Sequence, residues 1–502
     1  MPQLSPHRLL LAALGLTLAF RFWLAAVLPI TGDEAYFIWW GKNPDWGFYD
    51  HPPLIGWWLA ALLAVADSEW WLRLPQVVQP ALLALAVRWF WPRLWPQQAE
   101  RRDWAALLVL LAPVNVWNVL VTTDSALVFC AVLSGLAWLR AARDDSLRWY
   151  LVSGLFLAGA VLAKYFVALL GFAYLIDALR RRTRGAWAGL AIAYACCVPA
   201  LALMAWWNAG HCWPNYMFNF VNRHRATGMR WETPLLYAAM LLYMLTPPLL
   251  WGLFRRRAAS ADFSGVDRSL VVLAVVPFLL FAGLSLYKTI GLHWPLSFIP
   301  FVLLLAARRF SMAGLQKLAV FLLGFAALHL AAAFAVSRLP LETWQNQGFY
   351  PGLVLTFESR ALIERAAPGD TLLVSDGYSN AVTLGYNLRR YVPVLGPGSS
   401  HARHDDILTD WRVHDGRDIT VLRKSAPDPG EYDGWFRSVT TESFEQRGAR
   451  FWVVRGTGFD HAAYRDTVLA EVRRKYYALP RGLPQTGCYF CERYFSGQTC
   501  TR

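Results

Sequence analysis

Charged residues are scarce in this chain: they make up 16% of its 502 residues, whereas a soluble protein carries about 25%. Hydrophobic residues account for 56% and gather in runs close to membrane-spanning length. These two features exclude a wholly soluble protein and predict an integral membrane protein. A cleavable signal peptide is not evident either, because the first apolar run, from about Leu9 to Ile30, is longer than a signal core and lacks a small-residue cleavage site. We interpret this run as a retained signal anchor.

Hydropathy predicts a mainly α-helical, polytopic membrane protein with about eleven spans, followed by a soluble α/β domain. The predicted spans lie near residues 8–30, 70–91, 103–121, 124–142, 148–163, 165–180, 187–207, 234–254, 269–287, 291–307 and 315–336. The apolar segment 53–66 is too short to cross a membrane comfortably, so we expect a helix at the interface there.

Short basic clusters separate the apolar runs and produce the net charge of +14. Five of them fall in alternate loops, which predicts that these loops and the N-terminus are cytoplasmic. They are Arg88/Arg93/Arg101/Arg102, Arg140/Arg143/Arg148, Arg180/Arg181/Arg182/Arg184, Arg255/Arg256/Arg257 and Arg308/Arg309/Lys317. With an odd number of spans, the C-terminal segment then lies outside. Because the charge is explained by topology, it gives little support for nucleic-acid binding.

The loops on the opposite side have a different chemistry. The first one places the adjacent carboxylates Asp33 and Glu34, a third carboxylate at Asp50, and His51 among aromatic residues such as Tyr36. This mixture suits an interfacial site for a ligand that is partly apolar and partly charged, and a solvated helix cap is the plainer alternative. Further isolated polar residues are predicted on this side: Asp124, Lys164, Arg223, Arg225, Lys288 and His293. Asp124 also fits a helix cap and Lys164 a snorkelling anchor, but their shared side favours a function.

The composition changes after about Ser337, where charge, glycine and turn residues become frequent. We therefore predict two domains, a membrane domain over residues 1–336 and an extracytoplasmic α/β domain over residues 337–502. The segments TLLVSDG, DITVLR and FWVVRG read as strands, and helical patterns lie around 357–366 and 460–474. A phosphate-binding glycine loop is not found in this domain. The group His401, His404, Asp405, Asp406 and His414 has some metal-like spacing, but a solvated loop is the preferred interpretation.

Cysteine is also rare, with seven residues in the whole chain. Cys130, Cys196 and Cys197 fall in predicted spans and are expected to be buried thiols. Cys212, Cys488, Cys491 and Cys500 fall outside the spans, and four cysteines allow three pairings. The CYFC motif at 488–491 lacks a second ligand pair for zinc, so structural disulfides are expected.

The motifs of the outer loops resemble those of the GT-C glycosyltransferases, in particular the bacterial relatives of protein O-mannosyltransferases and the lipid A aminoarabinose transferases. The resemblance rests on an Asp-Glu pair after the first span and on a Tyr-Asp-His-Pro-Pro-Leu run that leads into a tryptophan-rich helix. Further similar motifs are Arg-Leu-Pro at 73–75, beginning with Arg73, Thr-Asp-Ser-Ala-Leu at 123–127, Ala-Lys-Tyr at 163–165 and His-Trp-Pro at 293–295. The similarity covers about residues 8–336.

This resemblance implies an inverting transfer of a sugar from a polyprenyl-phosphate donor to an envelope acceptor, which is lipid A or lipopolysaccharide, another glycolipid, or a protein. It implies that Asp33 is the base or the acceptor-orienting carboxylate, with Glu34 and Asp50 as further catalytic candidates. The aminoarabinose transferases have Glu-Lys-Pro where this chain has Asp50-His51-Pro52, which weakens the phosphate contact at that position. The candidates for binding the donor phosphate are His51, Lys164, Arg223, Arg225, Lys288 and His293.

The residues present also suit sugar transfer without reference to the resemblance. The acceptor hydroxyl needs a carboxylate about 3 Å away to take its proton, and the departing phosphate needs cations. No cofactor is demanded, although a divalent metal bridging carboxylate and phosphate is compatible with Asp33, Asp124 and His51 as ligands. The alternative functions are a lipid or solute transporter with an outer domain, and a non-catalytic assembly factor. A transporter would place polar residues near the membrane midplane within repeated halves, and neither feature is visible.

Overall fold

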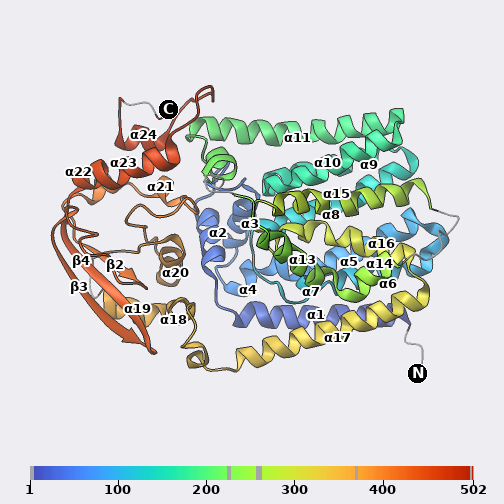
Figure 1. The fold of residues 1–502 in the computed structure, drawn as a ribbon, viewed down its shortest axis with the longest axis horizontal. Helices are drawn as coiled ribbons and strands as arrows, with labels where there is room; N and C mark the ends of the chain where they lie inside the picture. The colour runs from blue at the N-terminus through green and yellow to red at the C-terminus, as the bar shows by residue number, and fades with distance from the viewer. Residues whose placement is uncertain (1–4, 223–227, 256–262, 368–370, 498–499, 501–502) are drawn as a thin grey trace. The chain divides into compact units, whose positions relative to one another are not determined.

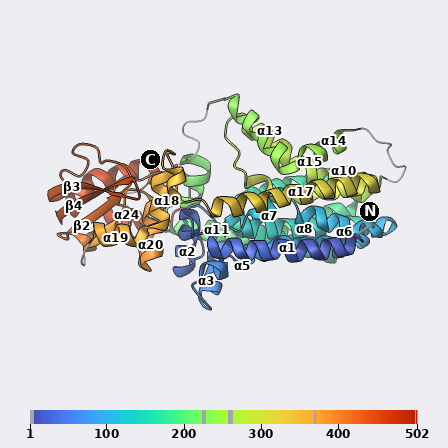
Figure 2. The same cartoon turned by 90° about the horizontal axis from the view of Figure 1, so that it is seen from below.

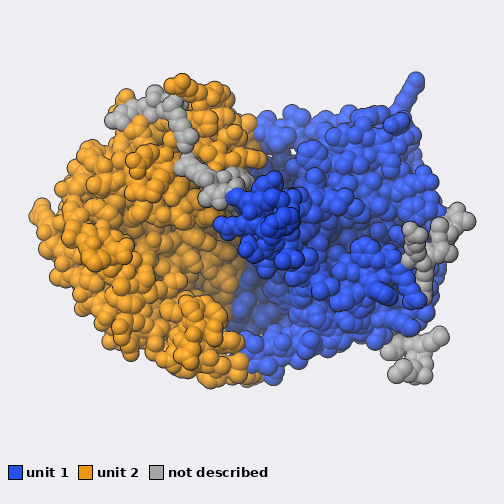
Figure 3. Space-filling view, in the orientation of Figure 1, with its two compact units in different colours: residues 1–28, 65–202, 227–337 blue, residues 29–64, 203–226, 338–502 orange. Residues whose placement is uncertain are grey.

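The computed structural model describes residues 5–222, 228–255, 263–367, 371–497 and 500. The chain forms two compact units, which Figure 3 distinguishes by colour. The first unit contains residues 1–28, 65–202 and 227–337, and the second contains residues 29–64, 203–226 and 338–502. The units therefore differ from a single cut after residue 336, because the two short segments 29–64 and 203–226 belong with the C-terminal segment.

The described part of the first unit is helical (Figures 1 and 2). Its helices are α1 (Pro6–Val27), α4 (Glu69–Leu72), α5 (Leu74–Leu94), α6 (Arg102–Leu110), α7 (Pro113–Trp117), α8 (Thr123–Asp144), α9 (Leu147–Ala163), α10 (Ala168–Arg181), α11 (Arg184–Gly210), α13 (Glu232–Leu245), α14 (Pro247–Phe254), α15 (Gly265–Ser285), α16 (Ile299–Arg309) and α17 (Met312–Ser337). Helix α11 begins in this unit and ends in the second. Helices α1 and α17 lie side by side in both views, with the rings of Trp23 and Phe334 5.9 Å apart.

Each predicted span coincides with a helix or a pair of helices, but only some of these can cross a membrane unaided. Among the described residues, α1, α8, α11, α15 and α17 are long and apolar enough, and α13 with α14 forms a sixth candidate that is bent by 94°. The predicted span 103–121 is divided between α6 and α7, where Pro113 cannot continue the preceding helix. A mostly helical membrane protein is thus confirmed, while the number of about eleven spans stays a prediction.

Two buried arginines tie broken helices of the first unit together. Pro80 lies inside α5 and has no N–H, so the carbonyl of Gln76 loses its helical partner. The guanidinium of Arg21, 1% exposed, donates to that carbonyl and to the carbonyl of Val77, the latter at 2.9 Å. Arg73, fully buried, donates to the carbonyl of Ala25 near the C-terminal end of α1. These charges therefore satisfy main-chain carbonyls at helix breaks and ends.

The second unit contains a four-stranded sheet with the order β1-β2-β4-β3. Its strands are β1 (Leu372–Val374), β2 (Ile419–Arg423), β3 (Phe436–Gln446) and β4 (Ala449–Phe459). Strands β1 and β2 are parallel, and the other pairs are antiparallel. Three strands were predicted from their apolar runs. Strand β3 was not, because it is an edge strand with mostly exposed polar side chains.

Alternate residues of these strands face two separate cores. Val374 and Val421 belong to one core, and Leu373 and Leu422 belong to the other, as the period of two in a strand requires. The first core also receives side chains from the helical run after β4, and the second receives α18, α19 and α20. The predicted α/β architecture of the C-terminal segment is confirmed.

The helices of the second unit are short. They are α2 (Gly32–Lys42), α3 (Leu54–Leu63), α12 (Pro214–Tyr216), α18 (Tyr350–Phe357), α19 (Ser359–Ala366), α20 (Tyr378–Leu388), α21 (Asp405–Leu408), α22 (His461–Tyr464), α23 (Ala470–Val472) and α24 (Tyr489–Tyr494). The apolar segment 53–66 forms α3, so a helix at this place is confirmed.

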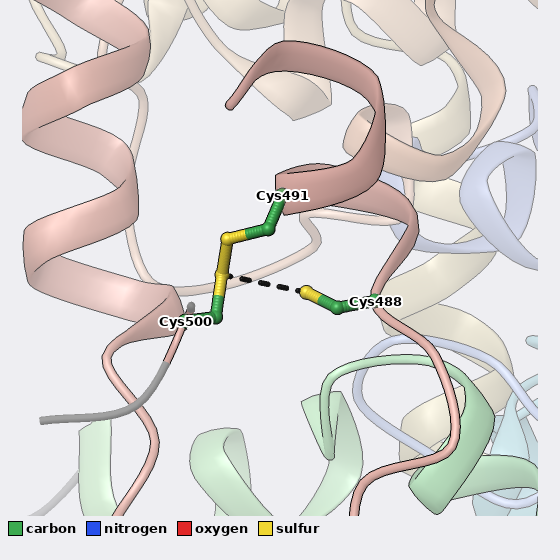
Figure 4. A group of neighbouring side chains, drawn as sticks. All are labelled: Cys488, Cys491 and Cys500. Carbon is green, nitrogen blue, oxygen red and sulfur yellow. Dashed lines mark hydrogen bonds between the residues drawn. A yellow bond between two sulfur atoms is a disulfide. The ribbon is translucent and has the colours of Figure 1, made fainter. Parts of the chain in front are cut away.

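Two disulfides join parts of the second unit. Cys212 pairs with Cys488, and Cys491 pairs with Cys500, so the predicted structural disulfides are confirmed and the two cysteines of CYFC do not pair with each other. The Sγ atoms of Cys488 and Cys500 lie 3.4 Å apart (Figure 4). The first disulfide links residues 276 positions apart and fastens the segment 203–226 to the C-terminal segment.

Candidate functional site

The N-terminus of α2 carries the two adjacent carboxylates. Thr31 caps the helix and forms a capping box with Glu34, whose Oε2 accepts from the backbone N and the Oγ1 of Thr31, both at 3.1 Å. Glu34 is fully buried, whereas Asp33 is exposed to solvent. The sequence Thr-Gly-Asp-Glu therefore uses one acid to fix the first turn and leaves the other accessible.

Asp33 has a hydrogen-bond donor that the sequence did not reveal. The hydroxyl of Tyr378, the first residue of α20, donates to Asp33 Oδ1 at 3.1 Å. Helices α2 and α20 approach closely because residue 32 is glycine, since a Cβ there would lie 2.4 Å from Ser379 Oγ. Burial and the charge of Asp33 raise the pKa of Tyr378, so its hydroxyl stays protonated and can donate. The signal that could have found Tyr378 is its place just after a predicted strand, because ligands bind beyond the carboxyl ends of strands in open α/β sheets.

Asp50 is buried and engaged on both oxygens. Tyr36 donates to its Oδ1 at 2.7 Å, and the backbone N of Ala402 donates to its Oδ2 at 3.2 Å. The Tyr36 hydroxyl in turn accepts from the backbone N of His404 at 3.2 Å. Burial, followed by the charge of Asp50, raises the pKa of Tyr36 well above its usual value. Asp50 and Tyr36 thus form a clamp that holds segment 402–404 against the segment 31–54.

His51 lies among aromatic rings. Its ring centroid is 6.5 Å from that of Phe37, 6.3 Å from that of Trp40 and 6.4 Å from that of Phe218. Trp40 also stacks on Phe48 at 4.3 Å. The predicted aromatic surroundings of the first loop are therefore present, and the role of His51 toward a phosphate or a metal stays a prediction.

A second group of predicted residues lies in the first unit. Lys164 Nζ donates to both carboxylate oxygens of Asp124, at 2.9 and 2.8 Å, and His293 Nε2 is 3.9 Å from Asp124 Oδ2. Asp124 follows the N-cap Thr122 of α8, and its side chain and that of Lys164 are only 9% and 8% exposed. Asp124 balances the charge of Lys164, so the pair as a whole is neutral. Lys164 uses two of its three N–H groups on Asp124, and the third is the one that remains for an anion.

The structure gives less information about the remaining predicted site residues. Lys288 is half-buried in the first unit, Arg73 supports the end of α1, and Arg223 and Arg225 lie outside the described residues. For the predicted metal, Asp33 and His51 lie in the second unit and Asp124 in the first. Within the described part of the chain, the one group with metal-ligand spacing is Cys488, Cys491 and Cys500, and these cysteines take part in disulfides. A bridging metal thus stays a prediction.

The interpretation of residues 401–414 as a solvated loop is wrong for its central part. His404 is 2% exposed, and burial lowers its pKa to about 3, so the imidazole is neutral. Asp405 Oδ1 accepts from the hydroxyl of Tyr391, and burial raises the pKa of Asp405 to about 7. Asp406 forms a bidentate pair with Arg403, which is also buried. Hydrogen bonds from the backbone N of Ala402 to Asp50 and from that of His404 to Tyr36 hold this segment within the second unit.

Known proteins resemble the chain in sequence and in fold. Residues 50–207 match the family model described as dolichyl-phosphate-mannose-protein mannosyltransferase. Over 226 residues the chain is 31% identical to the lipid A galacturonosyltransferase RgtD of Rhizobium johnstonii, which covers 41% of this chain and 45% of the relative. The chain thus matches about half the length of this curated relative.

The structure is similar to that of ArnT from Cupriavidus metallidurans. The TM-score is 0.62 at 15% identity for the form bound to undecaprenyl phosphate and 0.60 at 16% identity for the apo form. Each comparison covers 88% of this chain and 97% of that chain. This likeness shows the fold: the chain is a multi-pass membrane protein with the GT-C architecture, as its motifs predicted.

Proposed function

We propose that this protein is an integral-membrane glycosyltransferase that moves a sugar from a polyprenyl-phosphate donor to an envelope acceptor. The observation that carries the proposal is Asp33, an exposed carboxylate fixed at the start of α2 by the buried Glu34 and oriented by Tyr378. The ArnT-like fold and the match to a mannosyltransferase family model support this chemistry. A transporter finds no comparable support.

Asp33 acts as the base in this mechanism. Its carboxylate takes the proton of an acceptor hydroxyl, and the acceptor oxygen attacks the anomeric carbon from the face opposite the phosphate. The bond between the anomeric carbon and the phosphate oxygen breaks, so the configuration inverts and polyprenyl phosphate leaves. Positive charge must compensate the departing phosphate, and His51, Lys164, Arg223, Arg225, Lys288 and His293 stay the candidates for that role. Glu34 and Asp50 are positioning residues in this scheme, because each is buried and engaged.

The sequence similarity to a lipid A galacturonosyltransferase favours galacturonic acid as the sugar and lipid A as the acceptor. A polyprenyl phosphate is the donor carrier, in line with the undecaprenyl phosphate bound to ArnT. We place the reaction at the outer face of a bacterial inner membrane, with the N-terminus cytoplasmic and the C-terminal segment periplasmic. Five alternating basic clusters and two disulfides in the second unit support this orientation.

The test is transfer by purified protein in detergent from radiolabelled polyprenyl-phosphate galacturonic acid to lipid A. We expect wild-type activity to be lost in Asp33→Asn, which keeps the size of the side chain but cannot accept the proton. The matched control is Asp433→Asn, a change at an exposed carboxylate elsewhere in the second unit. Full transfer by Asp33→Asn would refute the base role, and failure of wild-type protein with every polyprenyl-phosphate sugar would refute the transferase itself.

A further inference from the structure

A cavity of about 330 Å³ lies in the second unit, at the end of the sheet where the parallel strands β1 and β2 terminate. This volume is within the range of small-molecule binding sites. Its wall contains Asp376 and Tyr378 after β1, Gly396, and Arg423 at the end of β2. A short parallel bridge between Ser375 and Val394 adds a third parallel segment beside β1. The cavity therefore lies beyond the carboxyl ends of three parallel segments, the usual ligand position in open α/β sheets.

The main chain beside the cavity is shaped by glycine. Gly396 has φ +109°, a conformation that other residues rarely adopt, and it lies two residues after the bridge residue Val394. Its backbone N donates to the hydroxyl of Tyr464 at 2.9 Å, so the turn is fixed. The wall is thus ordered by the fold and does not depend on a ligand to form it.

A buried arginine at the cavity wall holds two of its acidic residues. Arg423 is 8% exposed, and its Nη1 donates to Glu431 Oε2 at 2.7 Å and to the hydroxyl of Tyr432 at 2.9 Å. Its Nε lies 3.4 Å from Asp376 Oδ2 but makes no hydrogen bond, although it is buried. Because this atom is buried, its interaction is the ion pair with Asp376, and Arg423 contributes to the wall by fixing Asp376 and Glu431 in place.

Acceptors at the same wall are incompletely used. Asp405 uses Oδ1 for Tyr391 and for the backbone N of Val394, which leaves Oδ2. Glu431 uses Oε2 for Arg423 and for the backbone N of Asp428, which leaves Oε1. The lining residues Asp405 and Glu431 thus each keep one carboxylate oxygen that makes no hydrogen bond within the described residues. Sugar hydroxyl groups, which both donate and accept, complement such a set.

The charge of the wall argues against an anionic ligand. Four carboxyl groups and two guanidinium groups line the cavity: Asp376, Asp405, Asp406 and Glu431 with Arg403 and Arg423. Because the pKa of Asp405 is raised to about 7, this carboxyl is only partly ionised at neutral pH, and the other three still outnumber the two guanidinium groups. Arg403 is fully engaged by Asp406 and by backbone carbonyls, including that of Pro397 at 2.7 Å. A phosphate or a uronic acid would face this surplus of negative charge.

Tyr378 connects the cavity with the proposed base. It lines the cavity, and its hydroxyl donates to Asp33 Oδ1. A ligand in the cavity would therefore lie beside the residue that orients Asp33. We propose that this cavity binds a sugar ring of the acceptor, hydroxyl-rich and free of negative charge, and so presents an acceptor hydroxyl to Asp33. This inference rests on the proposed glycosyltransferase function and names the acceptor class.

The experiment is saturation-transfer NMR on the full-length protein in detergent, with D-glucosamine and D-glucuronic acid as probes. Both share the pyranose ring; at neutral pH the first carries an ammonium group and no negative charge, and only the second carries a carboxylate. We expect saturation transfer to glucosamine and none to glucuronic acid. Asp405→Asn keeps an oxygen for Tyr391 and for the N of Val394 while replacing the open acceptor by a donor, and we expect about tenfold weaker glucosamine binding. Glu442→Gln, on the exposed edge strand β3, is the matched control and should bind like wild type.

The outcomes separate this inference from the proposed function. Absence of a glucosamine signal, equal binding of glucuronic acid, or unchanged binding in Asp405→Asn overturns the acceptor cavity, even when transfer is observed. Glucosamine binding that persists in a protein without any transferase activity refutes the proposed function while leaving a sugar-binding cavity. Where transfer is measurable, Asp405→Asn should raise the KM for the acceptor about tenfold and leave the KM for the donor unchanged. Equal effects on both constants would count against the cavity.

Discussion

The clamp between Tyr36 and Asp50 gives the sharpest stability prediction. Tyr36→Phe keeps the ring but deletes the hydroxyl that joins Asp50 Oδ1, at 2.7 Å, to the backbone N of His404, at 3.2 Å. A hydrogen bond to a charged acceptor contributes about 2 kcal/mol and a neutral one about 1 kcal/mol, so we expect the second unit to lose about 3 kcal/mol. For a unit of roughly 200 residues this lowers the melting temperature by about 6–12 °C.

Hydrogen exchange followed by mass spectrometry tests this at the right place. Peptides covering residues 400–408 should exchange faster in Tyr36→Phe, because the N–H of His404 loses its partner and segment 402–404 loses its link to α2. The matched control is Tyr476→Phe, since the hydroxyl of Tyr476 makes no hydrogen bond within the described residues. Wild-type melting and exchange in Tyr36→Phe would show that the clamp does not stabilise this unit.

Three further predictions follow from contacts in the two units. Tyr378→Phe removes the hydrogen bond to the proposed base, so we expect kcat about tenfold lower; because this bond is exposed to solvent, unlike that of Tyr36, we expect little change in the melting temperature, and an unchanged kcat would remove its positioning role. Lys164→Met removes the cation that pairs with the buried carboxylate of Asp124 and should destabilise the protein by about 3–5 kcal/mol. The double variant with Asp124→Asn should recover part of this loss in thermal unfolding. Burial raises the pKa of Asp405 from 3.8 to about 7, so its contribution to stability falls as pH rises between these values. Burial lowers the pKa of His404 from 6.5 to about 3, so its contribution rises with pH over that window, and Asp405→Asn should expose this rise in pH-dependent unfolding; a flat profile in the variant would contradict it.

The membrane architecture and the first candidate loop could be predicted because their signals are local. Apolar runs identify helices regardless of their neighbours, and an acid pair directly after the first span marks a helix start. The same local logic identified strands β1, β2 and β4. It failed for β3, whose polar residues are stabilised by pairing with β4 and not by their own burial.

Contacts between segments far apart in the sequence could not be predicted. The hydrogen bond from Tyr378 to Asp33 joins residues 345 positions apart, and that from Ala402 to Asp50 joins residues 352 positions apart. The solvated-loop interpretation of His404 failed for the same reason, since its burial depends on aromatic residues of the first loop such as Trp40 and Phe48. Single-sequence patterns contain periodicity and local caps, but not which distant segment will cover a polar one.

The disulfide between Cys212 and Cys488 constrains how the intervening chain threads the membrane. Both sulfur atoms occupy one side, so the chain between them must cross the bilayer an even number of times. Among the described helices in between, α15 and α17 are long enough to cross alone, and the bent pair of α13 and α14 is the third candidate. Because α15 and α17 already make two crossings, an even total allows two arrangements of the other helices. Either the bent pair and α16, which has 11 residues, both cross the membrane, or neither the bent pair nor α16 crosses it. A single covalent bond in the second unit thereby couples the topology of two irregular helical segments in the first.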